Sequence, residues 1–201
     1  MSELLLQDAT FVVVDVETTG MDPVTDRITE IAMMKIKGSA LQDEFSTLIN
    51  PLIPIPEFIT RLTGIDDLMV RDAPPAREVA PYIAEFLGDA VFVAHNAPFD
   101  WGFIRQTLHR ERDIDARNRQ LCTVRLSRRI LPSLPSKSLD PVTRALNIHI
   151  PERHRASGDA YATALVLIKF LSFLQKSAGL RTVDELIKFQ FGSGALPKAH
   201  P

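Results

Sequence analysis

The first third of the chain consists of short apolar segments separated by turn residues. We expect strands over Phe11–Glu17, Ile28–Lys37 and Glu44–Ile49, because each is rich in β-branched or aromatic residues and is bounded by Gly, Asp, Asn or Pro. Short turns at Gly20–Pro23 and Lys37–Ser39 connect them. Because short turns join antiparallel neighbours, the pattern predicts an antiparallel meander.

Farther along the chain the apolar positions recur with helical spacing. In Ala76–Leu87, the side chains of Val79, Ile83 and Leu87 fall on one helical face, and Gly88 is a natural stop. The run Val91–Ala94 is continuously apolar, which is typical of a buried parallel strand. A meander followed by strand–helix units predicts an α/β fold with a mixed central sheet flanked by helices. The other expected helices lie around Glu57–Leu62, from about Asn96 to Arg110, and over Thr123–Leu131, Leu139–Leu146, Gly158–Ser177 and Thr182–Phe189.

The length of 201 residues suffices for one domain with a sizeable core. We assign residues 1–180 to that domain and residues 181–201 to a short C-terminal helix and tail. The second segment carries several large apolar side chains, so it is expected either to cover the core or to dock to a partner. These side chains are Leu186, Ile187, Phe189 and Phe191.

Composition narrows the class of protein. Apolar residues make up 45% and charged residues 24%, as in an ordinary globular domain. No uninterrupted apolar run approaches the ~20 residues of a membrane span, and the N-terminus lacks the features of a signal peptide. A single cysteine, Cys122, suits a reducing compartment. We therefore expect a cytoplasmic protein with no membrane partner and a buried Cys122 thiol.

The charge is unevenly distributed, although its sum is only −2. Residues 1–104 contain 6 Lys/Arg and 17 Asp/Glu, whereas residues 105–155 contain 12 and 5. Most of the cations in the middle segment are arginines, which bind phosphate in a bidentate fashion. Local ion pairs on a solvated helix explain such a run equally well.

Two acids, Asp15 and Glu17, end the first expected strand. Alternate residues of a strand point to the same side, so both carboxylates leave the sheet together. Two like charges beside an apolar core are costly unless a cation joins them. A hard divalent cation such as Mg²⁺ or Mn²⁺ is the simplest occupant, because it prefers oxygen ligands.

Three more candidates lie far along the chain. Asp100 and Asp159 each fall in the first turn of an expected helix, where the helix dipole alone favours an acid. His154 precedes the second of these helices in a polar loop and, taken singly, is an ordinary surface histidine. None of the three is persuasive alone.

Together, however, the segments Asp15–Gly20, His95–Asp100 and His154–Ala160 resemble the three motifs of the DEDD exonucleases. The histidine of the third motif is similar to that of the DEDDh branch, which includes RNase T and the DNA polymerase III epsilon proofreading subunit. The resemblance covers about residues 10–175 and includes Ile59–Ile65. One departure is Cys122, where many relatives have Asp.

The resemblance implies an RNase H-like (exonuclease) fold with two divalent cations, Mg²⁺ or Mn²⁺, at its centre. By analogy, Asp15 would bridge both ions, Glu17 and Asp159 would bind one, and Asp100 would bind the other. His154 would act as the general base toward the attacking water.

Further residues are expected to hold the 3′ end of a nucleic acid. The backbone at positions 18–20 would face the terminal sugar, while Met21 and positions 62–65 would contact its base. Trp101 is a candidate for base stacking, since it lies on another helical face than Phe99 and Phe103, whose i,i+4 spacing favours the core. The substrate-binding candidates are Thr18, Thr19, Gly20, Met21, Leu62, Thr63, Gly64, Ile65, His95, Asn96 and Phe99.

The function implied is that of a metal-dependent 3′→5′ exonuclease on single-stranded or frayed DNA ends. It would release nucleoside 5′-monophosphates, as in proofreading or repair. One alternative is an exoribonuclease of the RNase T or oligoribonuclease type, because contacts to the 2′-OH leave no motif. Another is a module of weak activity docked to a DNA polymerase subunit.

Overall fold

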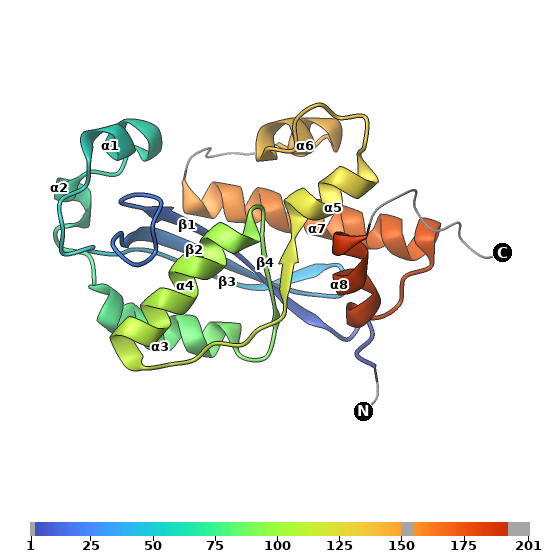
Figure 1. Cartoon of the computed structure of the whole chain (residues 1–201), viewed down its shortest axis with the longest axis horizontal. Coiled ribbons are helices and arrows are strands. Elements are labelled where there is room, and N and C mark those ends of the chain that lie inside the picture. Colours follow the sequence, from blue (N-terminus) through green and yellow to red (C-terminus); the bar gives the residue numbers. More distant parts are fainter. Residues whose placement is uncertain (1–2, 150–154, 193–201) are drawn as a thin grey trace.

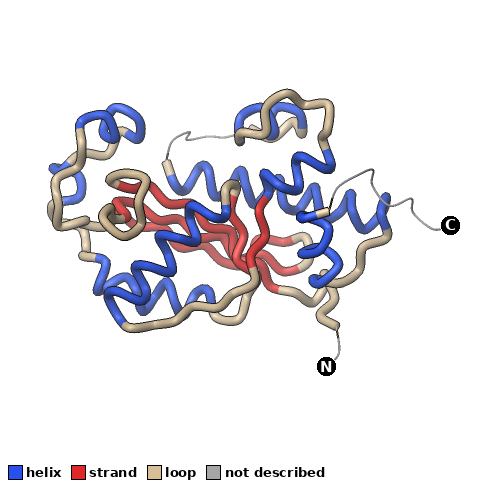
Figure 2. The backbone as a smooth tube through the Cα atoms, viewed as in Figure 1, coloured by secondary structure: helices blue, strands red, loops and turns tan. Residues whose placement is uncertain are grey.

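The computed structural model describes residues 3–149 and 155–192. Its centre is a twisted sheet of five strands, coloured red in Figure 2. In space the strands follow the order β3-β2-β1-β4-β5. Strand β2 is antiparallel to both of its neighbours, β1 and β3, whereas β4 pairs parallel with β1 and β5 pairs parallel with β4. The strands are β1 (Thr10–Thr18), β2 (Ile28–Lys37), β3 (Ala40–Leu48), β4 (Val91–Ala94) and β5 (Gln120–Cys122).

Helices cover both faces of this sheet (Figure 1). Helices α3 and α4 pack together on one face, and α7 crosses the other face against β1 and β2. The helices are α1 (Glu57–Thr63), α2 (Asp67–Val70), α3 (Ala76–Leu87), α4 (Ala97–Arg112), α5 (Thr123–Ile130), α6 (Leu139–Ala145), α7 (Ala156–Ala178) and α8 (Val183–Phe191).

The alternation of β1 divides its side chains between two cores. Phe11 and Val13 pack in the core under α7, whereas Val12, Val14 and Val16 pack in the core under α3 and α4. Because the period is two, Asp15 and Glu17 continue the Phe11–Val13 row on the α7 side. The strand pattern therefore decides which helix can meet the two acids.

The 23 residues of α7 are long and apolar enough to cross a membrane by length and composition alone. In this fold, 61% of its most apolar window is buried inside the protein. The side chains of Val166, Leu167 and Phe170 lie in the core shared with β1 and β2. The helix therefore has the burial of a core helix.

The described part of the C-terminal segment packs onto the domain. Leu186 and Phe189 of α8 belong to the same core as α7, and α8 contacts β5 and α5. A capping box joins Thr182 and Glu185 at the start of the helix. Of the two roles expected for this segment, covering the core is the one that its described residues perform.

The predicted α/β fold, with a mixed sheet between helices, is confirmed. Two short elements, β5 and α2, were not expected, and β3 begins four residues before the predicted Glu44. The stacking role predicted for Trp101 is wrong, because its ring is buried and packs edge-on against Phe92, with ring centroids 4.9 Å apart. The Cys122 thiol is buried, as predicted.

Candidate active site

The acids of β1 meet the first turn of α7. Ligand oxygens of Asp15, Glu17 and Asp159 all lie within 4.8 Å of one another. Asp159 is buried, and Asp15 and Glu17 are half-buried, so water solvates this group of three carboxylates only in part. Helix α7 thus adds a third carboxylate, that of Asp159, which lies 142 residues after Glu17 in the sequence.

A fourth acid on this face is neutralised by the protein itself. Glu30 of β2 lies directly opposite Glu17 in the antiparallel register, and like charges so placed repel. The buried Glu30 carboxylate accepts hydrogen bonds from Arg155 Nε at 3.1 Å and Nη2 at 2.5 Å, and from the Ala156 N–H at 2.9 Å. Glu30 and Arg155 therefore fasten the beginning of α7 to the sheet.

Asp100 reaches the same region from the opposite face of the sheet. It lies in the first turn of α4, and its Oδ1 accepts the Val16 N–H at 3.3 Å, between the two acids of β1. Burial raises the pKa of Asp100 to about 7, while hydrogen bonds from the backbone N–H groups of Asp100 and Val16 act in the opposite direction. Without a cation, this carboxyl group therefore holds its proton up to near-neutral pH.

Four acids, but not Glu30, line one cavity of about 550 Å³: Asp15, Glu17, Asp100 and Asp159. Its other walls come from the end of β4, from α5 and from the segment before α6. Of the predicted substrate-binding residues, His95, Asn96 and Phe99 line this cavity. The remaining lining residues are Val16, Val124, Arg128, Lys137, Ser138 and Leu139.

The ring of His95 is engaged within the protein. Its Nε2 lies 2.8 Å from the carbonyl oxygen of Lys137, and its Nδ1 lies 2.9 Å from Thr123 Oγ1. Since a carbonyl only accepts, Nε2 donates to it, and in the neutral ring Nδ1 then accepts from the threonine hydroxyl. His95 therefore holds α5 and the segment around Lys137 against the end of β4, which shapes the cavity wall.

The turn after β1 is held by its own hydrogen bonds. Thr18 Oγ1 donates to the Gly20 carbonyl at 2.6 Å, and Thr19 Oγ1 accepts the Arg27 N–H at 3.0 Å. A Cβ on Gly20 would lie 2.4 Å from Asp26 Oδ2, so a larger residue here requires the Asp26 side chain to move. Met21 projects from the turn and is 77% exposed.

The predicted contacts at positions 62–65 divide by burial. Ile65 is fully buried with Ile59, and Thr63 is also buried, so neither side chain is presented to a ligand. Gly64 ends α1 in the left-handed region, with φ of 77°. Leu62 is 59% exposed, so among positions 62–65 its side chain is the one open to solvent.

His154, the predicted general base, lies outside the described residues. Sequence reasoning missed Glu30 and Arg155, and it missed Arg128 and Lys137 in the cavity wall. The isolated acid in the apolar strand Ile28–Lys37 was the available signal for Glu30. The excess of cations in residues 105–155 includes Arg128 and Lys137, but it did not single them out.

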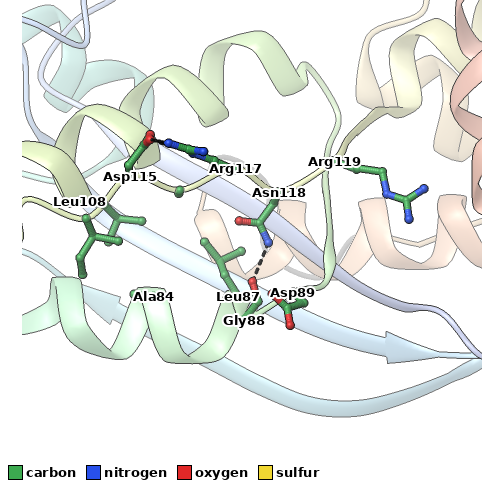
Figure 3. Close-up of a pocket in the computed structure, with 11 residues that line it drawn as sticks. Ala84, Leu87, Gly88, Asp89, Leu108, Asp115, Arg117, Asn118 and Arg119 are labelled. Carbon is green, nitrogen blue, oxygen red and sulfur yellow. Dashed lines mark hydrogen bonds and ion pairs between the residues drawn. The ribbon is translucent and has the colours of Figure 1, made fainter. Parts of the chain in front are cut away.

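A second cavity, of about 420 Å³, lies between the C-terminal parts of α3 and α4 and the segment before β5 (Figure 3). Several of its polar side chains are paired within the protein: Arg117 pairs with Asp115 at 2.7 Å, and Asn118 Nδ2 donates to the Gly88 carbonyl at 2.8 Å. The carboxylate cluster belongs to the first cavity, so we place the candidate active site there.

Comparison with known proteins shows the family of the chain. Residues 12–167 match the exonuclease family RNase T, and the matched region includes all four acids. The chain belongs to this exonuclease family. The predicted RNase H-like fold and the resemblance to DEDDh exonucleases are thereby confirmed.

The related proteins of this exonuclease family are much longer than the present chain. A DNA polymerase III of the PolC type from Caldanaerobacter subterraneus is 44% identical over 176 residues, which cover 88% of this chain and 12% of that protein. A putative bifunctional exonuclease/endonuclease from Mycobacterium tuberculosis is 44% identical over 192 residues, covering 92% and 30%. The chain therefore corresponds to one part of these relatives.

Solved structures include an exonuclease of similar size. Exonuclease X, in complex with 5′-overhanging duplex DNA, has a TM-score of 0.72 and 26% identity, covering 90% of this chain and 99% of that one. The zinc-bound complex of E. coli exonuclease I with single-stranded DNA has a TM-score of 0.70 at 21% identity, covering 85% and 41%. At 21% identity, the similarity to exonuclease I shows a shared fold.

The donor set fits the metal dependence of this exonuclease family. Asp15, Glu17 and Asp159 offer only carboxylate oxygens, the ligands of hard divalent cations, and within the described residues no His or Cys joins the cluster. Three carboxylates gathered within 4.8 Å repel one another unless positive charge is added. This cluster could therefore bind a metal ion.

Proposed function

We propose that this chain is a metal-dependent 3′→5′ exonuclease that acts on single-stranded or frayed DNA ends and releases nucleoside 5′-monophosphates. The observation that carries the proposal is the cluster of Asp15, Glu17 and Asp159, with Asp100 in the same cavity. Four carboxylates match the charge of two divalent ions, Mg²⁺ or Mn²⁺.

The acids have distinct roles in this proposal. By analogy with the related exonucleases, Asp15 would be shared by both ions, Glu17 and Asp159 would hold the first, and Asp100 would hold the second. When bound, two such ions stabilise the attacking and leaving oxygens of an in-line displacement. His154 would accept a proton from the attacking water, because its ordinary pKa of about 6.5 suits a general base at neutral pH.

DNA is the preferred substrate because of what the relatives are. One group of relatives is named as DNA polymerase III, and the structure of exonuclease X is a complex with DNA. The exposed Met21 and Leu62 would contact the terminal base, and the turn at positions 18–20 would contact the sugar. Association with a DNA polymerase follows from the same relatives, and a cytoplasmic location follows from the composition.

The test compares matched DNA and RNA strands. Single strands of equal sequence, labelled at either the 3′ or the 5′ end, are incubated with the chain in Mg²⁺, Mn²⁺ or EDTA. We expect metal-dependent removal of 3′ nucleotides, faster on DNA than on RNA. Faster RNA degradation would replace DNA by RNA as the substrate, and cleavage that persists in EDTA would refute the metal-dependent mechanism.

A further inference from the structure

The cavity that holds the acids also has a basic wall. Arg128 of α5 and Lys137 of the segment before α6 line it together with Asp15 and Asp159. The proposed metal site accounts for the acids but gives the cations no role. A nucleic acid strand carries one negative phosphate per nucleotide, so a strand reaching the acids brings further phosphates with it.

The phase of α5 decides which of its arginines reaches the cavity. Arg125 and Arg129 are one turn apart and face α8, where their guanidinium carbons lie 4.5 Å and 3.9 Å from the ring centroids of Phe191 and Phe189. Val124 and Arg128, also one turn apart, line the cavity. The two rows thus assign the first pair of arginines to packing and Arg128 to the cavity.

The two cations of this wall differ in their internal contacts. The Lys137 ammonium donates to the Leu134 carbonyl in its own segment. In the part of the chain that the structure describes, Arg128 is exposed and forms no hydrogen bond or ion pair. By contrast, Arg117 and Arg119 of the same basic middle segment pair with Asp115 and Asp184.

The helix that carries Arg128 is firmly held. The Val124 N–H donates to the His95 carbonyl at 3.1 Å, and Ser127 Oγ donates to the Thr123 carbonyl at 2.7 Å. Just before the helix, the Cys122 N–H donates to Gln190 Oε1 of α8 at 2.9 Å. A guanidinium on such a rigid base binds with less loss of conformational freedom than one on a loop.

We propose that Arg128 binds a phosphate of the substrate strand, the one next to the reacting phosphate on its 5′ side. The planar guanidinium donates two parallel hydrogen bonds to phosphate oxygens, and the contact reads neither the base nor the sugar. Arg128 therefore positions the strand and distinguishes a polynucleotide from a substrate with a single phosphate. This assignment rests on the proposed exonuclease function.

The experiment compares two substrates that differ in the neighbouring phosphate. One is a short single-stranded oligothymidylate, and the other is the 4-nitrophenyl ester of thymidine 5′-monophosphate, which has one phosphodiester. Loss of a charge-assisted contact should lower the ratio of the two kcat/KM values about tenfold in Arg128→Ala. The matched control is Arg125→Ala, which removes the same charge from the same helix and should keep the wild-type ratio.

Salt dependence gives a second readout. Each phosphate contact contributes about 0.7 to the slope of log kcat/KM against log salt for a single strand, so Arg128→Ala should flatten the slope by about that amount between roughly 50 and 200 mM salt. Arg128→Lys should restore the slope, because it keeps the charge. It should restore the ratio of the two kcat/KM values only in part, because lysine does not donate two parallel hydrogen bonds. As a control for folding, the midpoint temperature of thermal unfolding of Arg128→Ala should equal that of the wild type.

The outcomes separate the two proposals. If the wild type degrades the oligonucleotide while Arg128→Ala shows the ratio and salt slope of Arg125→Ala, the phosphate contact is refuted and the exonuclease function stands. If the wild type degrades neither substrate, the exonuclease function is refuted and the contact with it.

Discussion

Replacing Glu30 tests whether the beginning of α7 is held by its contact with the sheet. In the described structure, the Glu30 carboxylate accepts from Arg155 and from the first backbone N–H of α7, that of Ala156. Glu30→Ala removes every one of these bonds. The variant also removes the bonds between the Arg155 guanidinium and the Glu30 carboxylate.

The expected loss of stability follows from burial. Removing one partner of a fully buried pair costs about 3–5 kcal/mol. The Glu30 side chain is 6% exposed but that of Arg155 is 37% exposed, so water can take over part of the guanidinium's solvation. We therefore expect Glu30→Ala to lower the free energy of unfolding by about 2–3 kcal/mol, and Glu30→Gln, which keeps an acceptor for Ala156, by about 1–2 kcal/mol.

The matched control is Glu57→Ala. Glu57 also pairs with an arginine, Arg61, at 2.7 Å, but the two side chains are 83% and 68% exposed. Such a surface pair contributes at most about 1 kcal/mol. Urea unfolding in EDTA measures all variants through the fluorescence of Trp101, the one tryptophan of the chain, which is buried against Phe92.

Activity supplies a second measurement on Glu30→Ala. Since Asp159 lies in the first turn of α7, a displaced helix start should lower kcat under conditions where the variant is fully folded, with less change in KM. Equal stability of Glu30→Ala and Glu57→Ala would refute the fastening role. A destabilised variant with wild-type kcat would refute the effect on the active site.

Four further variants test the proposed active site. Asp15→Ala should lose more activity and more Mn²⁺ affinity than Glu17→Ala, measured by turnover and calorimetry, since Asp15 is the proposed shared ligand; equal losses would contradict sharing. His154→Ala should lower kcat about 10²–10⁴-fold while retaining Mn²⁺ binding, and near-wild-type turnover would remove it as the general base. Burial raises the pKa of Asp100 to about 7. In EDTA, between about pH 4 and 7, the folded state therefore keeps the Asp100 proton, whereas the unfolded state has released it. Stability in EDTA should therefore fall by up to about 1.4 kcal/mol for each pH unit across this window, and Asp100→Asn should remove that part of the slope; an unchanged slope would refute the assignment.

Much of the fold was predictable because its elements have strong local patterns. The bounds of β2, α3 and β4 agree with those predicted from apolar spacing and turn residues. The strand β5 was missed because it has three residues, too few to show a period. Trp101 was misplaced because helical spacing says which residues share a face, and only packing decides whether that face meets the core or the solvent.

The sequence by itself determined that Asp15 and Glu17 lie on one side of a strand, because the period of two is a property of the local backbone. It also identified Asp100 and Asp159, through motifs whose residues are close together along the chain. Only the tertiary structure decided that α7 supplies the third carboxylate within 4.8 Å.

The roles of the remaining charges also needed the tertiary structure. Glu30 and Arg155 are 125 residues apart, and Arg128 differs from Arg125 and Arg129 only through the rotation of α5 against α8. Contacts between distant segments depend on how helices and strands pack, and no local pattern records that packing. The sequence therefore predicted the carboxylate chemistry, whereas the fold decided which charged groups lie together.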